Sequence, residues 1–142
     1  MPSVQWEQTT ALIPRVAVSR APGVARDLQP TGHYSLFAIQ LLDDLGLTAS
    51  DTAVFTVPDS DMAPVINVSD DALIHLTEKR LSQGNLFLIG AGEHVTIRRA
   101  FSPDGGASWT LSAERQTAPQ ISISGASQCQ IFGRVRWIGH RL

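Results

Sequence analysis

Short apolar runs separated by turn residues fill the chain after Gly46, and they constrain its fold more than any other feature. Four such runs, at residues 53–57, 73–76, 86–89 and 95–101, lie between clusters of Asp, Ser, Gly and Pro. Runs of about four to eight residues bounded by turn residues are typical of β-strands, because helices need longer periodic segments. The sequence therefore predicts a mainly β fold.

The closing segment gives the clearest strand pattern, because its side chains alternate between two different faces. Such a strand is either an internal core strand or an edge that pairs with a second copy across a two-fold axis. The candidate dimer residues are Arg134, Val135, Arg136 and Trp137. One predicted face holds Cys129, Ile131, Gly133, Val135 and Trp137, and the other holds Gln130, Phe132, Arg134 and Arg136.

Glycine-containing turns and one helix complete the expected elements. Gly90-Ala91-Gly92 and Asp104-Gly105-Gly106 follow strand-like runs and predict turns, the second of which leads into a further short strand. The first is not a dinucleotide-binding turn, because Val95 stands where the third glycine would be. Apolar residues at helical spacing predict a helix over residues 34–45, ending before Gly46.

Prolines and a glycine punctuate the first thirty residues and favour an arm over a packed element. A short extended stretch at residues 15–18 interrupts them. We therefore expect two parts, an arm at residues 1–30 and a β domain at residues 31–142.

Composition excludes several classes of protein. Of the 142 residues, 43% are hydrophobic and only 17% are charged, which is globular rather than disordered composition. The single cysteine, Cys129, excludes an internal disulfide and a multi-thiolate zinc site, and the four histidines lack metal-ligand spacing. We expect no cofactor and no metal. We also expect no membrane segment and no signal peptide, and hence a cytoplasmic protein.

The segment at residues 57–74 has a distinctive order of residue types. Met62 and Pro64 are separated by one residue, an apolar pair follows at once, and Asp70 and Asp71 precede an apolar run. This segment resembles the C-terminal domain of LexA and phage CI-type repressors, in which Gly-Asp-Ser-Met-x-Pro is followed by an apolar pair and Gly-Asp. Further matches follow in the family's order, so the resemblance covers residues 11–142. They lie at residues 83–87, 95–99 and 131–137.

The resemblance implies both a fold and a reaction. The fold is a small, mainly β domain of LexA/signal-peptidase-like twisted sheets, with one short helix and an N-terminal arm. In the family, the serine of Gly-Asp-Ser-Met attacks an Ala-Gly bond in the protein's own arm. A neutral lysine on a later strand removes its proton, because a hydroxyl is a weak nucleophile without a base. Ala21, Pro22 and Gly23 are the cleavage-site-like residues of this chain.

Both positions of this catalytic dyad are altered here, since Asp61 aligns with the serine and Arg98 with the lysine. A carboxylate is a poor attacker of an amide, and a guanidinium that stays protonated cannot act as a general base. Pro22 also interrupts the Ala-Gly bond with a tertiary amide of restricted φ. The alignment therefore predicts a peptidase-like domain with no catalytic residues, which does not cut itself and pairs Asp61 with Arg98.

Three alternatives stay open at this point. Ser60, one residue before the family's position, is an alternative nucleophile, with Lys79 in a predicted loop as its one side-chain amine. Asp61 and Arg98 are separate exposed charges if the alignment is shifted. A polymerase-accessory protein similar to UmuD is the third, since such proteins also lack a DNA-binding domain and have a comparable length.

The resemblance implies association as the main function. We expect a non-cleaving regulatory and oligomerisation domain of a phage or prophage-type transcriptional repressor. Its partners would be a second copy, in a homodimer or higher oligomer, or a related repressor, with an antirepressor protein as a route to derepression. DNA would be contacted only through a separate N-terminal helix-turn-helix domain. The residues before Tyr34 leave no room for one, which indicates either an excised domain or a naturally short protein.

Overall fold

The computed structural model describes residues 9–19, 26–124 and 129–140. Strands dominate these residues, and one short helix and one 3-10 turn interrupt them. In chain order the elements are β1 (Thr10–Val18), β2 (Leu28–Ala38), α2 (Ile39–Asp44), η1 (Ala49–Asp51), β3 (Thr52–Thr56), β4 (Asp71–His75), β5 (Leu86–Ala91), β6 (His94–Phe101), β7 (Ser108–Ser112), β8 (Ile121–Ser124) and β9 (Cys129–Gly139).

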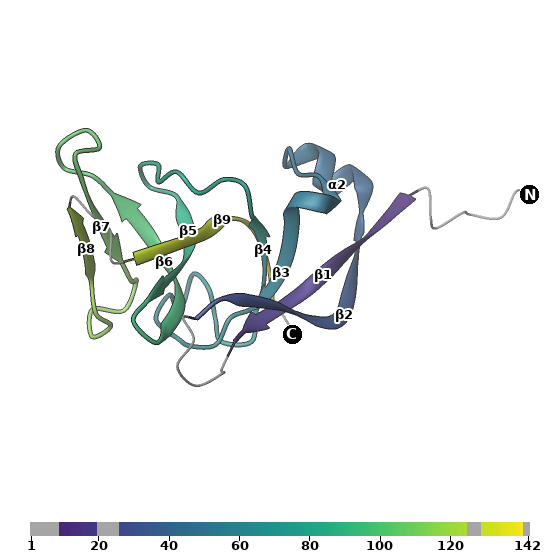
Figure 1. The fold of residues 1–142 in the computed structure, drawn as a ribbon, viewed down its shortest axis with the longest axis horizontal. Coiled ribbons are helices and arrows are strands. Elements are labelled where there is room, and N and C mark those ends of the chain that lie inside the picture. Colours follow the sequence, from purple (N-terminus) through teal and green to yellow (C-terminus); the bar gives the residue numbers. More distant parts are fainter. Residues whose placement is uncertain (1–8, 20–25, 125–128, 141–142) are drawn as a thin grey trace, which may run out of the picture.

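Within the described residues, nine strands form one sheet in the order β2-β1-β3-β4-β9-β5-β6-β7-β8. Neighbouring strands are antiparallel except β1 and β3, which run parallel. Figure 1 shows the long β1–β2 hairpin at one end, β7 and β8 at the other, and β9 crossing the middle. This is the mainly β fold with one short helix that the sequence predicts.

Three clusters of buried side chains hold the sheet together. The central cluster includes Met62 and Ile66 from the loop after β3, so this loop is part of the core. A second cluster lies beside α2, where Leu42 packs with Ile13 of β1. A third joins β5, β6 and β7 around Phe87. Because burying one such side chain stabilises a fold by about 1.5–3 kcal/mol, the loop after β3 is firmly anchored.

Most of the predicted strands are confirmed. β3, β4, β5 and β6 coincide with the four apolar runs to within two residues at each end, and β7 follows the turn at residues 104–106. The hairpin predicted at residues 90–92 is also confirmed, but Gly90 and Ala91 still belong to β5, and the turn is at Gly92 and Glu93, with Gly92 at a positive φ of 59°. β8 was not predicted, since its four residues alternate isoleucine and serine too briefly to give a signal.

The helix is much shorter than predicted. Residues 34–38 belong to β2, and α2 covers only Ile39–Asp44. The apolar residues that suggested a helix alternate in the strand, where Phe37 packs against the α2 cluster while Tyr34 and Leu36 are exposed. Pairing with β1 supplies the backbone hydrogen bonds of these residues, whereas an isolated helix of this length gains little.

The prediction of an unpacked arm is wrong for residues 10–18. These residues form β1, which pairs with β2 on one side and with β3 on the other. Ile13 is completely buried in the α2 cluster. Pro14 does not break the strand, because the pairing with β2 shifts register between Pro14 and Val16, where a missing N–H is tolerated. The division into two parts at residue 30 stays a prediction.

The predicted faces of β9 are also wrong. Its pairing with β5 shifts register between Leu88 and Ile89, and its pairing with β4 shifts between Leu73 and Ile74. Each such bulge moves the following side chains to the opposite face. Ile131 therefore packs in the third cluster, Val135 in the central cluster and Trp137 against the α2 cluster.

A search of the described residues finds no helix with the length and apolar character needed to cross a bilayer.

Gly133 gives a test of this packing. A Cβ at this position would collide with the backbone carbonyl of His75 and lie 2.9 Å from Ile74 Cγ2. We expect Gly133→Ala to lower the free energy of unfolding by about 1–3 kcal/mol, as overpacked cores do. Gly90→Ala is the control, because a Cβ there would have a side-chain atom of Phe132, and no backbone atom, as its nearest contact, at 3.0 Å. Urea denaturation of both variants measures the difference, and equal losses would contradict the close approach.

Candidate functional site around Asp61 and Arg98

The loop that carries Asp61 follows β3 and is fixed at both ends. Val57 N–H donates to the Asp70 carbonyl, and Ser69 N–H donates to the Val57 carbonyl, each at 2.8 Å. Between these ends Met62 is 1% exposed and Ile66 is fully buried. The Ala63-Pro64 peptide bond is cis. Because apolar side chains on the loop are inserted into the core, Asp61 beside them has a defined position.

Asp61 and Arg98 lie together, although 37 residues separate them in sequence. Arg98 Nη2 donates to Asp61 Oδ2 at 2.8 Å. The Arg98 side chain is 2% exposed and that of Asp61 is 27% exposed, so the pair spans the boundary between core and solvent. The structure therefore excludes the alternative in which the two residues are separate exposed charges.

The remaining donors of Arg98 show how strongly it depends on this carboxylate. Its Nη1 donates to Thr96 Oγ1 and to the Ile97 carbonyl, both at 2.9 Å. Its Nε is buried and has no hydrogen-bond partner among the described residues. A buried guanidinium with unfilled donors is expensive to desolvate, so the charge of Asp61 is its main compensation.

Asp59 is a second acid at the site, which the sequence did not single out. Its Oδ2 accepts a hydrogen bond from Thr96 Oγ1 at 2.9 Å, and its Oδ1 accepts one from Asp61 N–H at 3.1 Å. Thr96 thus links Asp59 to Arg98. The sequence did contain a signal for this contact. Asp59 and Asp61 are two residues apart, as are Thr96 and Arg98, and residues two apart on a strand lie on the same face.

Ser60 is turned away from Arg98. Its Oγ accepts a hydrogen bond from Arg115 Nη1 at 2.6 Å, and Arg115 N–H donates to the Asp61 carbonyl at 2.9 Å. Arg115 lies in the connection between β7 and β8. Lys79 lies in the exposed turn after β4, and in the described part of the chain Ser60 has no lysine among its hydrogen-bond partners. The structure therefore does not bring the alternative nucleophile and its amine together.

A groove lies beside these residues. It encloses about 420 Å³ and is lined by Val18 at the end of β1, by Arg26 before β2, and by Asp59. Pro58, Glu93, His94 and Val95 complete its walls. Ser19 N–H donates to the Asp27 carbonyl at 2.7 Å, which brings the two ends of the β1–β2 connection together at this groove. The cleavage-site-like residues Ala21, Pro22 and Gly23 lie outside the described residues.

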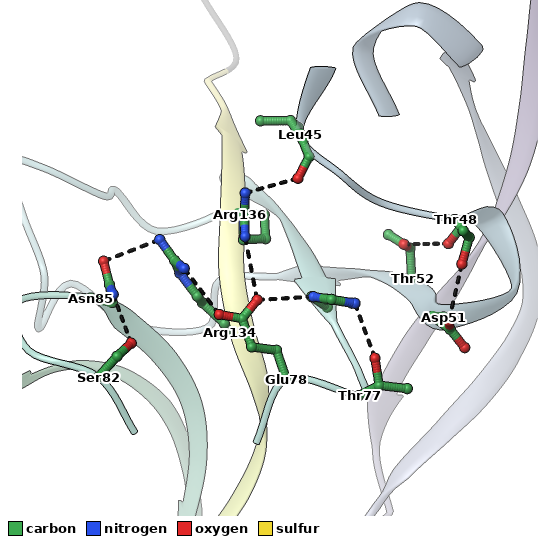
Figure 2. Close-up of polar contacts among 11 residues, drawn as sticks. Leu45, Thr48, Asp51, Thr52, Thr77, Glu78, Ser82, Asn85, Arg134 and Arg136 are labelled. Atoms are coloured by element: carbon green, nitrogen blue, oxygen red, sulfur yellow. Dashed lines mark hydrogen bonds and ion pairs between the residues drawn. The ribbon is translucent and has the colours of Figure 1, made fainter. Parts of the chain in front are cut away.

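Arg134 and Arg136 of the predicted dimer strand share one carboxylate. Figure 2 shows both guanidinium groups directed toward Glu78, at 2.9 and 3.3 Å, and Arg136 also donating to the Leu45 carbonyl. His75 Nδ1 is 2.9 Å from the same carboxylate. Burial alone would raise the pKa of Glu78, but the hydrogen bonds from His75 and Arg134 and the charges of both arginines outweigh it and lower the pKa.

The place of these arginines in the sheet bears on the dimer prediction. β9 pairs with β5 over residues 129–134 and with β4 over residues 134–139. The ladder with β5 therefore stops at Arg134, and the edge of residues 135–139 that faces away from β4 extends beyond it. Val135 itself is 7% exposed, so its side chain is not available to a partner.

The cysteine and two of the histidines are buried or engaged in contacts with neighbouring side chains. Burial raises the pKa of the Cys129 thiol, which makes it a poor nucleophile. His140 Nδ1 lies 2.6 Å from Asp70 Oδ2, and His75 contacts Glu78 and Thr77. Over the described ranges, no three acidic, histidine or cysteine side chains are grouped as a metal site would require.

The Asp61–Arg98 pair predicts a pattern of stabilities. Asp61→Asn leaves a buried charge without its partner and should lower the free energy of unfolding by about 3 kcal/mol. Adding Arg98→Met should recover part of that loss, because both charges are then gone. Glu114→Gln is the matched control, since it breaks an exposed pair with Arg99 and should lose less than about 1 kcal/mol. Additive losses in a double-mutant cycle would rule out the coupling.

The lowered pKa of Glu78 predicts an acid dependence with a definite sign. The ionised carboxylate stabilises the folded state at pH values above its ordinary pKa of 4.5, and this contribution is lost as the pH falls through the lower folded value. Wild type should therefore exceed Glu78→Gln in thermal stability at neutral pH, and the gap should narrow on acidification below 4.5. A gap that widens in acid would contradict the cause, as would an NMR titration giving a raised Glu78 pKa.

Two comparisons with known proteins bear on the family of this chain. Residues 21–136 match the family model described as Peptidase S24-like. The chain is also 35% identical over 116 residues to a protein of Haemophilus influenzae named as an uncharacterized HTH-type transcriptional regulator. The match covers 80% of this chain and 48% of that protein, so the chain spans about half the length of its curated relative. The chain belongs to the Peptidase S24-like family.

Proposed function

We propose that this chain is the non-cleaving regulatory domain of a phage or prophage-type transcriptional repressor, acting in the cytoplasm through association rather than peptide hydrolysis. The observation that carries the proposal is the ion pair between Asp61 and the buried Arg98, at the two positions that align with the family's serine and lysine. A repressor role is supported by the relative named as a transcriptional regulator.

The loss of cleavage is argued from the chemistry of these two side chains. Serine attack requires a hydroxyl next to a base that accepts its proton. Arg98 stays protonated and is already a donor to Asp61, Thr96 and the Ile97 carbonyl, so it offers no acceptor. Asp61 is held as the counter-charge of Arg98. Ser60, the remaining hydroxyl of the loop, is engaged by Arg115 instead of a neutral amine.

The groove at Asp59 lies at the two ends of the β1–β2 connection, and we propose that this connection is no longer a substrate. Both ends of that connection line the groove, and Pro22 replaces the Ala-Gly peptide bond of cleaving relatives by a tertiary amide. A repressor built in this way would not be inactivated by self-cleavage. Its release from DNA would need another route, such as binding of an antirepressor protein.

Association is proposed to use the free part of β9. Beyond Arg134 this strand has an edge outside the ladder with β5, and antiparallel pairing of two such edges about a two-fold axis would join two sheets. Glu78 offsets the charge of Arg134 and Arg136 there, so two copies would not bring four uncompensated cations together. DNA would be bound by a separate helix-turn-helix domain of the kind named in the relative.

Intact mass spectrometry tests the loss of cleavage. We expect the mass of the purified chain to stay unchanged after long incubation from neutral to strongly alkaline pH, where a latent lysine base would become neutral. A fragment cut near Ala21 would refute the proposal. As a control, the variant with Asp61→Ser, Arg98→Lys and Pro22 deleted restores the dyad and the Ala-Gly bond together, and Asp61→Ser alone lacks the base.

A further inference from the structure

The two outer strands of the sheet differ sharply in how they are protected. β8 has only four residues, and short edge strands offer little surface for pairing. β2 has eleven residues and lies at the other end of the sheet order, where β1 is its one neighbour among the described strands. Natural edge strands of this length are commonly protected by charged side chains, but residues 28–38 contain no Asp, Glu, Lys or Arg.

An apolar surface accompanies this edge. Leu12 pairs with Leu36, and Pro14 pairs with Tyr34, so these four residues share one side of the β1–β2 hairpin, which we name the outer hairpin face. Leu12, Tyr34 and Leu36 are 60%, 59% and 66% exposed. The opposite side packs against the α2 cluster through Ile13 and Phe37. Figure 1 places this hairpin at the extreme end of the molecule, away from β5 and β6.

The regular part of the edge is its second half. Pro30 has no N–H to donate, and Gly32 has a positive φ of 84°, so the first half is interrupted. Residues 33–38 continue the strand, and residues 34–38 pair with β1 in an unbroken ladder that contains Tyr34 and Leu36. His33 N–H donates to Thr31 Oγ1, whereas the edge that residues 34–38 turn away from β1 has no strand paired to it among the described residues.

We infer that residues 33–38 of β2, together with the outer hairpin face, form a self-association surface that pairs with the same surface of a second copy. An unpaired strand edge is complemented by another extended strand, and a second copy supplies an identical one. In a two-fold pairing a residue next to the axis lies close to its own copy, so a charge there would meet a like charge nearby. The absence of charge from β2 removes that repulsion.

The expected geometry follows from antiparallel pairing. A two-fold axis at Ser35 places Tyr34 opposite Leu36 of the partner subunit, on the side where both are exposed. Ser35 itself points to the inner side, where its Oγ accepts a hydrogen bond from Arg15 at 2.7 Å. This surface is distinct from the β9 edge, and the inference requires neither the loss of cleavage nor a contact through β9.

Sedimentation velocity over a wide concentration series tests the inference. We expect wild type to self-associate, and Leu36→Lys to weaken association by about tenfold or more, equivalent to about 1.4 kcal/mol. The change replaces an apolar contact with Tyr34 of the partner subunit by a charge, and it brings two like charges close together beside the axis. Tyr34→Lys should act in the same way and gives a second measurement if either variant folds poorly. Val68→Lys is the matched control, since Val68 is 54% exposed outside the hairpin, and it should leave association unchanged.

The outcomes are separable. Hydrogen exchange at residues 33–38 should slow as wild type associates, which locates the contact on β2. A wild type that stays monomeric at every concentration overturns the inference, and so does a Leu36→Lys variant that associates as wild type does. Intact mass decides self-cleavage independently, so failure on β2 leaves the proposed non-cleaving function to stand or fall by its own test.

Discussion

A buried guanidinium is the constraint to which the centre of this structure is arranged. Arg98 lies on β6 with only 2% of its side chain exposed and cannot give up its proton to avoid the cost of burial. It therefore needs a carboxylate beside it, and Asp61 provides one at 2.8 Å. Asp61 reaches this place because Met62 and Ile66 anchor its loop in the core. Asp59 and Thr96 extend the same network toward the groove.

The same arrangement explains how one fold can serve either chemistry or association. A serine and a neutral lysine at these two positions would form a nucleophile and its base, whereas an aspartate and an arginine form an ion pair. The surrounding loop, strand and groove need not change. Membership of the Peptidase S24-like family therefore establishes the scaffold, and we propose that the two side chains determine what the scaffold does.

Charge compensation also stabilises a second part of the sheet. Glu78 holds Arg134, Arg136 and His75 together, and Arg136 in turn binds the carbonyl at the end of α2. This joins β9, the turn after β4 and the helix. The two strand edges that we propose for association differ in kind: the β9 edge has compensated charge nearby, and the β2 edge has none.

Local pattern was sufficient for much of the fold and for part of the site. Short apolar runs specified β3 to β7 and β9, because a strand of that length is recognisable from its own residues and the turns beside it. The order of residue types around Met62 specified the family, and through it the pairing of Asp61 with Arg98. These features depend on residues that are neighbours in sequence, or on a motif that encodes a distant contact.

Only the tertiary structure decided the remainder, because it depends on partners far away in the chain. Residues 34–38 have helical spacing but become a strand, since β1 pairs with them and supplies their hydrogen bonds. The faces of β9 are reset by bulges opposite β4 and β5, which no pattern within β9 reveals. Asp59, Thr96 and Arg115 join the site through contacts across 37 to 55 residues of sequence. Strand register and burial determine these features, and both are properties of the assembled sheet rather than of any one segment.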